Sequence, residues 1–144
     1  MSITTISKVN PTVITMEESY ALAISFPSTE ELTDGVPVKL DATGNVITVA
    51  ADGSDFPLGI VTRGTKTHVW EGRATVVTGF KQVLTVVASG AVTAGGFGIF
   101  DSYVAADGLK YKEGTGNALG MFLGAAADGE SVQIGIFKTP VTVA

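Results

Sequence analysis

The amino-acid sequence predicts an all-β protein of the sandwich or barrel type, and three observations support this prediction. Val, Ile and Thr make up 45 of the 144 residues, and their branched side chains fit pleated strands better than helices. A further 18 residues are glycine, and they divide the chain into many short apolar runs. No sustained 3.6-residue periodicity of apolar residues is visible, which disfavours helices.

Asp-Gly pairs mark the expected turns. Asp tolerates turn conformations and Gly supplies a positive φ, so this dipeptide favours tight turns between strands. It occurs at Asp34-Gly35, Asp52-Gly53, Asp107-Gly108 and Asp128-Gly129. The clearest hairpin joins strands at 36–40 and 45–50 across a turn at 41–44. Further strands are predicted at 58–62, 67–70, 73–78, 83–88, 98–100, 109–111, 118–123 and 131–137.

The first 34 residues differ in character from the rest. They carry one lysine and five acidic residues. Large side chains at 20, 22, 24 and 26 alternate with small ones, which is a strand pattern. We therefore predict an extended N-terminal arm over 1–34 that contains at least one strand, followed by a β-barrel domain over 35–144. The alternative is that 20–26 is an ordinary first strand of the barrel.

Charge and composition disfavour several kinds of partner. The net charge is −5 and the chain has two arginines. Nucleic acids and acidic membrane surfaces are therefore not expected partners, because both attract Lys and Arg. Charged residues make up 16% of the chain, against about 25% in typical domains. We expect other subunits to cover part of the apolar surface, and by composition alone a homodimer is possible.

The start of the chain lacks the basic and apolar regions of a signal peptide, and no run approaches 18 apolar residues. We expect synthesis in the cytoplasm of the producing cell. The chain has no cysteine, which excludes thiol catalysis and Cys-ligated metals.

No motif predicts catalysis, a metal or a cofactor. His68 is the sole histidine, and no G-x-S-x-G sequence provides a serine nucleophile. Trp70 lies two residues further on in a predicted strand, so the two should share one face as an interface pair. The glycine-rich segments 59–67 and 114–120 depart from nucleotide-binding spacings, and 52–55 reads as a solvated turn rather than a calcium site. We expect no enzyme activity.

Four groups of residues after the first 34 resemble the small all-β capsid decoration, or cement, proteins of tailed bacteriophages. They are Gly35-Val-Pro-Val-Lys-Leu with Gly44-Asn-Val; Pro57-Leu-Gly-Ile-Val; Val86-Val-Ala-Ser-Gly-Ala-Val-Thr-Ala-Gly-Gly; and Gly116-Asn-Ala-Leu-Gly with Ala125-Ala-Ala-Asp-Gly-Glu-Ser-Val-Gln-Ile. The resemblance covers residues 35–137, and the long N-terminal segment departs from it.

This resemblance implies a compact β-barrel or β-tulip-like domain, often a homotrimer. Such a protein sits on the outer capsid surface of the virion, where it bridges neighbouring major capsid proteins and stabilises the head. No catalytic residues come with the resemblance.

Two groups of residues are candidates for the capsid or subunit interface. The first lies in the arm, whose strand would add to the sheet edge of a neighbour; it comprises Ile3, Ile6, Val13, Ile14, Tyr20, Leu22, Ile24 and Phe26. The second is the pair His68 and Trp70. Deletion of 1–30 should then abolish capsid binding while the core still folds. The alternative function is a receptor- or carbohydrate-binding module of a head fibre or spike, with a sugar site centred on Trp70.

Overall fold

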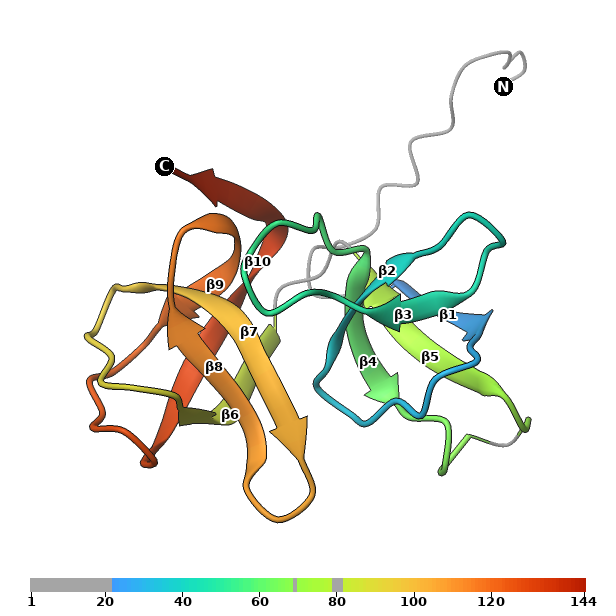
Figure 1. The fold of residues 1–144 in the computed structure, drawn as a ribbon, viewed down its shortest axis with the longest axis horizontal. Helices are drawn as coiled ribbons and strands as arrows, with labels where there is room; N and C mark the ends of the chain where they lie inside the picture. Colours follow the sequence, from blue (N-terminus) through green and yellow to red (C-terminus); the bar gives the residue numbers. More distant parts are fainter. Residues whose placement is uncertain (1–21, 69, 79–81) are drawn as a thin grey trace, which may run out of the picture.

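A computed structural model of the chain describes residues 22–68, 70–78 and 82–144 (Figure 1). These residues form strands and no helix, which confirms the predicted all-β class. The first five strands are β1 (Leu22–Pro27), β2 (Pro37–Leu40), β3 (Val46–Thr48), β4 (Gly59–Arg63) and β5 (Arg73–Thr78). The other five are β6 (Gln82–Ala88), β7 (Phe97–Val104), β8 (Gly108–Glu113), β9 (Gly116–Phe122) and β10 (Ser131–Val143).

The strands form two units that lie side by side (Figure 1). The first is an open antiparallel sheet in the order β1-β5-β4-β2-β3, and the second is a closed barrel in the order β10-β6-β8-β7-β9. Within the barrel, β6 and β8 pair in parallel. The barrel therefore occupies the second half of the range 35–144, and β2–β5 belong to the open sheet instead. Sequence alternation identifies strands but does not reveal which strands close into a barrel.

The strand β1 pairs with β5 over its whole length, from Leu22 opposite Thr78 to Pro27 opposite Arg73. Residues 22–27 are therefore an ordinary strand of the chain's own fold, as the alternative prediction had it, but at the edge of the open sheet and not in the barrel. Regular alternation also explains the longest strand, β10. Its residues Val132, Ile134 and Ile136 are buried, and the residues between them face outward.

The predicted Asp-Gly turns are confirmed. All four glycines adopt a positive φ: Gly35 (91°), Gly53 (77°), Gly108 (88°) and Gly129 (86°). The predicted hairpin turn at 41–44 is also present. There the Asp41 carboxylate accepts hydrogen bonds from the N–H groups of Thr43 and Asn45, as expected of an aspartate that begins a turn.

One hydrophobic core joins the two units. Val36, Val49 and Ile60 from the sheet cluster with buried barrel side chains that include Phe122 and Ile134. A second, smaller cluster lies within the sheet and comprises Leu32, Val38, Val46, Val61, Ala74 and Val76. The first cluster means that neither unit buries all its apolar surface without the other.

A buried tyrosine fixes the contact between the units. Tyr111 of β8 is fully buried, and its hydroxyl donates a hydrogen bond to the carbonyl of Gly35 at 3.2 Å. Burial raises the pKa of Tyr111, so the hydroxyl remains protonated and can donate this hydrogen bond. The ring of Phe100 packs edge-on against it, with ring centroids 5.9 Å apart.

A second set of hydrogen bonds joins the units through Asn117 of β9. Its backbone N–H donates to the carbonyl of Gly53 at 2.8 Å, and its side-chain amide donates to the carbonyls of Ser54 and Asp55. A Cβ on Gly53 would overlap the carbonyl of Thr115. The turn at 52–55 therefore fits against the barrel because it contains a glycine.

Replacing Tyr111 by Phe should lower the free energy of unfolding by about 1–3 kcal/mol, because the buried carbonyl of Gly35 loses its donor. Urea denaturation measures the change. Tyr103→Phe is the control, since Tyr103 is 39% exposed and should change stability by less than about 0.5 kcal/mol. Equal effects of the two substitutions would contradict the role assigned to the buried hydroxyl.

Candidate interaction surface

The loop between β4 and β5 presents an exposed tryptophan. Trp70 is 63% exposed, and its ring centroid lies 5.9 Å from that of His68. The N–H of Trp70 donates to Nδ1 of His68 at 3.0 Å. The predicted adjacency of the two rings is thus confirmed, but the predicted strand at 67–70 is wrong. The N–H of Thr67 bonds to the carbonyl of Gly64 and turns the chain there.

A serine and an arginine complete this cluster. Because Nδ1 of His68 accepts a hydrogen bond, the neutral ring carries its proton on Nε2, which lies 3.5 Å from Oγ of Ser25. The guanidinium of Arg73 donates to Oγ of Ser25 at 2.7 Å and to its carbonyl at 2.8 Å. Oγ of Ser25 thus faces two donors. A serine nucleophile has a different arrangement, in which an unprotonated nitrogen accepts the proton of the serine hydroxyl. The contacts of Ser25 with His68 and Arg73 connect the loop to β1.

The outer edge of β1 is partly blocked against strand addition. The N–H of Ser28 bonds to the carbonyl of Gly72, so by antiparallel alternation the backbone groups of Ala23, Ser25 and Pro27 face away from β5. Proline has no N–H to donate, and the carbonyl of Ser25 is already bound by the guanidinium described above. The end of β1 at Ala23 is left as the more accessible part of this edge.

The opposite edge of the sheet, β3, is covered by the chain itself. The carbonyl of Val46 accepts a hydrogen bond from the hydroxyl of Ser28 at 2.8 Å. The N–H of Thr48 donates to Oε1 of Glu30 at 3.0 Å. Side chains that bind the outward backbone groups in this way protect an edge strand from pairing with other chains. The segment 28–30 therefore has a structural role in the sheet.

Of the candidate interface residues in the predicted arm, only those in β1 lie in the described part of the chain. Ile3, Ile6, Val13, Ile14 and Tyr20 lie outside the described residues. The backbone of Leu22 begins β1. Ile24 is 40% exposed, whereas Phe26 packs against the small cluster inside the sheet. By strand alternation both side chains lie on the face of β1 opposite to Ser25, which contacts His68.

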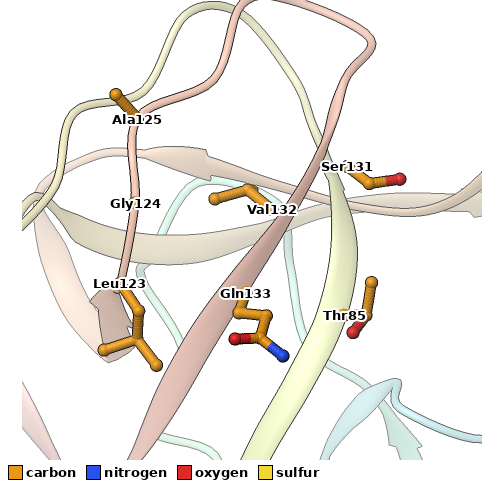
Figure 2. Close-up of a pocket in the computed structure, with 7 residues that line it drawn as sticks. All are labelled: Thr85, Leu123, Gly124, Ala125, Ser131, Val132 and Gln133. Carbon is orange, nitrogen blue, oxygen red and sulfur yellow. The ribbon is translucent and has the colours of Figure 1, made fainter.

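The outside of the barrel has a shallow hollow that sequence reasoning missed (Figure 2). Its volume is about 390 Å³, and it lies where β6 and β10 meet the turn after β9. No charged residue lines it; the lining residues are Thr85, Leu123, Gly124, Ala125, Ser131, Val132 and Gln133. Leu123 and the nearby Val83 are each more than half exposed. The sequence signal that could have indicated this hollow is the set of outward-facing residues of β6 and β10, such as Thr85 and Gln133.

A second hollow, the junction crevice, lies between the sheet and the barrel. Its volume is about 260 Å³. It is lined by residues from both units: Glu31, Thr33, Val36, Thr48, Phe100, Ser102 and Tyr103. The lining residues span more than seventy positions of the chain, so no local pattern in the sequence could reveal the crevice.

A β-bulge shapes the barrel side of the junction crevice. The pairing of β7 with β8 shifts register between Phe100 and Ser102, which leaves Asp101 without an opposite residue. Regular pairing resumes after the bulge, with Ser102 opposite Lys110 and Tyr103 opposite Leu109. Both Ser102 and Tyr103 line the crevice. Bulges of this kind redirect side chains and are common next to functional sites.

The bulged residue is anchored by its carboxylate. Burial opposes the charge of Asp101, but hydrogen bonds with Lys112, Ser89 and Ser102 outweigh burial and hold the pKa of Asp101 below its ordinary value. The Lys112 ammonium lies 3.3 Å from this carboxylate. The charged form of Asp101 therefore stabilises the bulge.

Acid should weaken this anchor. Because the pKa of Asp101 is lower in the folded state, its contribution to stability is present above the ordinary value of 3.8 and is lost as pH falls below it. The difference in unfolding free energy between the wild-type protein and Asp101→Asn should therefore be largest near neutral pH and shrink towards pH 3. Urea denaturation across this range tests it. A difference that stays constant with pH would contradict the role of the charge.

The acidic turn at 52–55 uses its carboxylates within the fold. Asp55 binds the ammonium of Lys39 at 2.7 Å and the N–H of Ala50 at 2.8 Å. Asp52 accepts a hydrogen bond from the N–H of Ser54.

Within 22–68, 70–78 and 82–144, no group of three or more His, Asp or Glu side chains could hold a metal ion. The same residues include no helix of the length and apolar character needed to cross a membrane.

No family model matches the chain, and no curated protein matches it.

The structure changes the expected outcome of an N-terminal deletion. Removing 1–30 would delete β1 and both groups that cover β3, so it should lower the free energy of unfolding by about 3 kcal/mol or more. Removing 1–20 keeps every described contact, so it should lower stability less than removing 1–30 does. Thermal and urea unfolding of both truncated proteins test this. Equal stability of the two would contradict the role of 22–30 in the sheet.

Proposed function

We propose that this protein is a capsid decoration protein, a structural virion component that binds the outer surface of a bacteriophage head and bridges major capsid proteins. The observation that carries the proposal is the exposed Trp70, whose backbone N–H binds His68, on a chain with little charge. Buried aromatic anchors contribute most of the energy of protein interfaces, and tryptophan is the most enriched among them.

The arrangement of the family-like stretches supports this proposal. The segments 35–40 and 57–61 bind each other, with the N–H of Leu58 bonded to the carbonyl of Val38. The segments 86–96 and 125–134 also pair, through a bridge between Val92 and Ala126. Residues that resemble the family therefore meet in space, as expected if they specify a common framework.

The proposed activity is stabilisation by binding. A protein that binds assembled shells but not dissociated capsid proteins shifts the equilibrium towards the intact particle by mass action, and no chemical step is needed. Self-association into a homotrimer belongs to the same proposal. The uncharged hollow on the barrel, with Leu123 and Val83 exposed beside it, is a suitable surface for contact between copies.

Co-sedimentation with expanded heads of the phage that encodes this chain, prepared without their decoration protein, tests the proposal. The wild-type protein should bind at a fixed ratio to capsid protein. Trp70→Ala should weaken binding at least about tenfold, because truncating a central aromatic anchor costs about 2 kcal/mol or more. Phe56→Ala is the matched control, since Phe56 is 60% exposed on a different loop, and it should bind as the wild type does.

Two outcomes would count against the proposal. Failure of the wild-type protein to bind shells would reject the decoration function. Normal binding by Trp70→Ala would reject this anchor. The alternative function, a receptor- or carbohydrate-binding module centred on Trp70, predicts instead that the wild-type protein binds glycans on an array and that Trp70→Ala abolishes this binding.

A further inference from the structure

We infer that the junction crevice binds a single neutral sugar ring. This inference concerns a different surface from Trp70 and does not depend on capsid binding. It rests on the division of the crevice into an apolar wall and a wall of hydrogen-bond acceptors, and on the lysine that offsets the charge of the carboxylate in its lining.

The apolar wall has a buried base and an exposed aromatic rim. Val36 and Phe100 are 3% and 6% exposed, whereas Tyr103 is 39% exposed. Ligand sites in proteins are commonly built from apolar and aromatic surface with a few polar groups that fix orientation. Sugar rings present an apolar C–H face that stacks on aromatic side chains, and Tyr103 offers such a ring together with a polar hydroxyl.

The polar wall consists mainly of acceptors. The hydroxyl of Thr48 already donates to Oε1 of Glu30 at 3.0 Å, and the hydroxyl of Ser102 donates to Asp101 at 3.2 Å. A hydroxyl that has donated its proton can still accept from a ligand. The carboxylate of Glu31 adds further acceptors. A ligand that satisfies these groups must carry several O–H or N–H donors.

The charges around the crevice favour a neutral ligand over a cation. Glu31 is the charged residue of the lining, and Lys66 lies 2.7 Å from its Oε2. The Lys66 ammonium already offsets the charge of Glu31, and both partners can still bind hydroxyl groups. Among ligands with several donors, a polyhydroxyl ring therefore fits better than an amine.

The size of the crevice restricts the ligand to one ring. Its volume of about 260 Å³ is below the range of about 300–1,000 Å³ found for drug-sized ligands. The β-bulge at Asp101 lies directly before Ser102 and Tyr103, which both line this space, and such irregularities are common next to functional sites. Because the lining comes from both units, a bound ring would also join the sheet to the barrel.

Titration of the full-length, ¹⁵N-labelled protein with single sugars tests the inference. Suitable probes are glucose, galactose, mannose, rhamnose and N-acetylglucosamine at millimolar concentrations, with ethylammonium chloride as the cationic probe. At least one sugar should shift the amide signals of Thr33, Thr48, Ser102 and Tyr103 with a saturable dependence, and ethylammonium should not. The same sugar should raise the melting temperature, since it binds the folded state.

Variants at the rim separate stacking from a general change of structure. Tyr103→Ala should raise the dissociation constant about tenfold or more, and Tyr103→Phe should restore binding because it keeps the ring. Phe56→Ala should leave the dissociation constant unchanged. If Tyr103→Ala alters the whole spectrum, Thr33→Val replaces it as the test variant, because it removes one hydroxyl and keeps the side-chain shape.

The inference is overturned by any of three results. These are no saturable shift with any sugar of the panel, shifts centred on His68 and Trp70 instead of the crevice, or shifts of the crevice amides by ethylammonium alone. Saturable shifts that Tyr103→Ala or Thr33→Val weakens, and that Phe56→Ala does not, support it.

Discussion

The packing of the barrel against the open sheet has to satisfy one buried hydroxyl group, that of Tyr111. A hydroxyl buried among apolar side chains must find an acceptor, and the carbonyl of Gly35 is the acceptor that this fold supplies. Gly35 reaches that position with a positive φ, and a Cβ there would overlap the side chain of Leu109. The first Asp-Gly turn, the strand β8 and the shared core are therefore mutually dependent.

The two units solve the problem of unpaired strand edges in different ways. The barrel has none because it closes on itself. The sheet keeps two edges but covers them with side chains: Ser28 and Glu30 bind the outward groups of β3, and Pro27 with Arg73 blocks half of β1. Contacts with other proteins must therefore use mainly side chains such as Trp70, rather than long ladders of backbone hydrogen bonds.

Local features of the fold could be predicted from the sequence, but long-range ones could not. The turns at Asp-Gly and the strand Arg73–Thr78 follow from alternation and from glycine's access to positive φ. The strand predicted at 67–70 failed because short polar turns and short strands look alike in composition. Barrel closure and the junction crevice depend on which distant strands pair, and a period of two residues contains no such information. The predicted adjacency of His68 and Trp70 is correct although the strand is not, because residues two positions apart can lie close together in a turn as well as in a strand.

The place of β10 in the barrel has a consequence for how the chain is made. This strand pairs with both β6 and β9, and its pairing with β9 extends to Val143, opposite Gly116. The sheet, in contrast, has all its strands once Thr78 has been synthesised. On the ribosome the sheet is therefore free to assemble first, with Val36, Val49 and Ile60 exposed, and the barrel can close only once β10 has also been synthesised. Between the synthesis of the sheet and that of β10, growing chains therefore expose apolar surface that the barrel later covers, and they are most prone to aggregate in this interval.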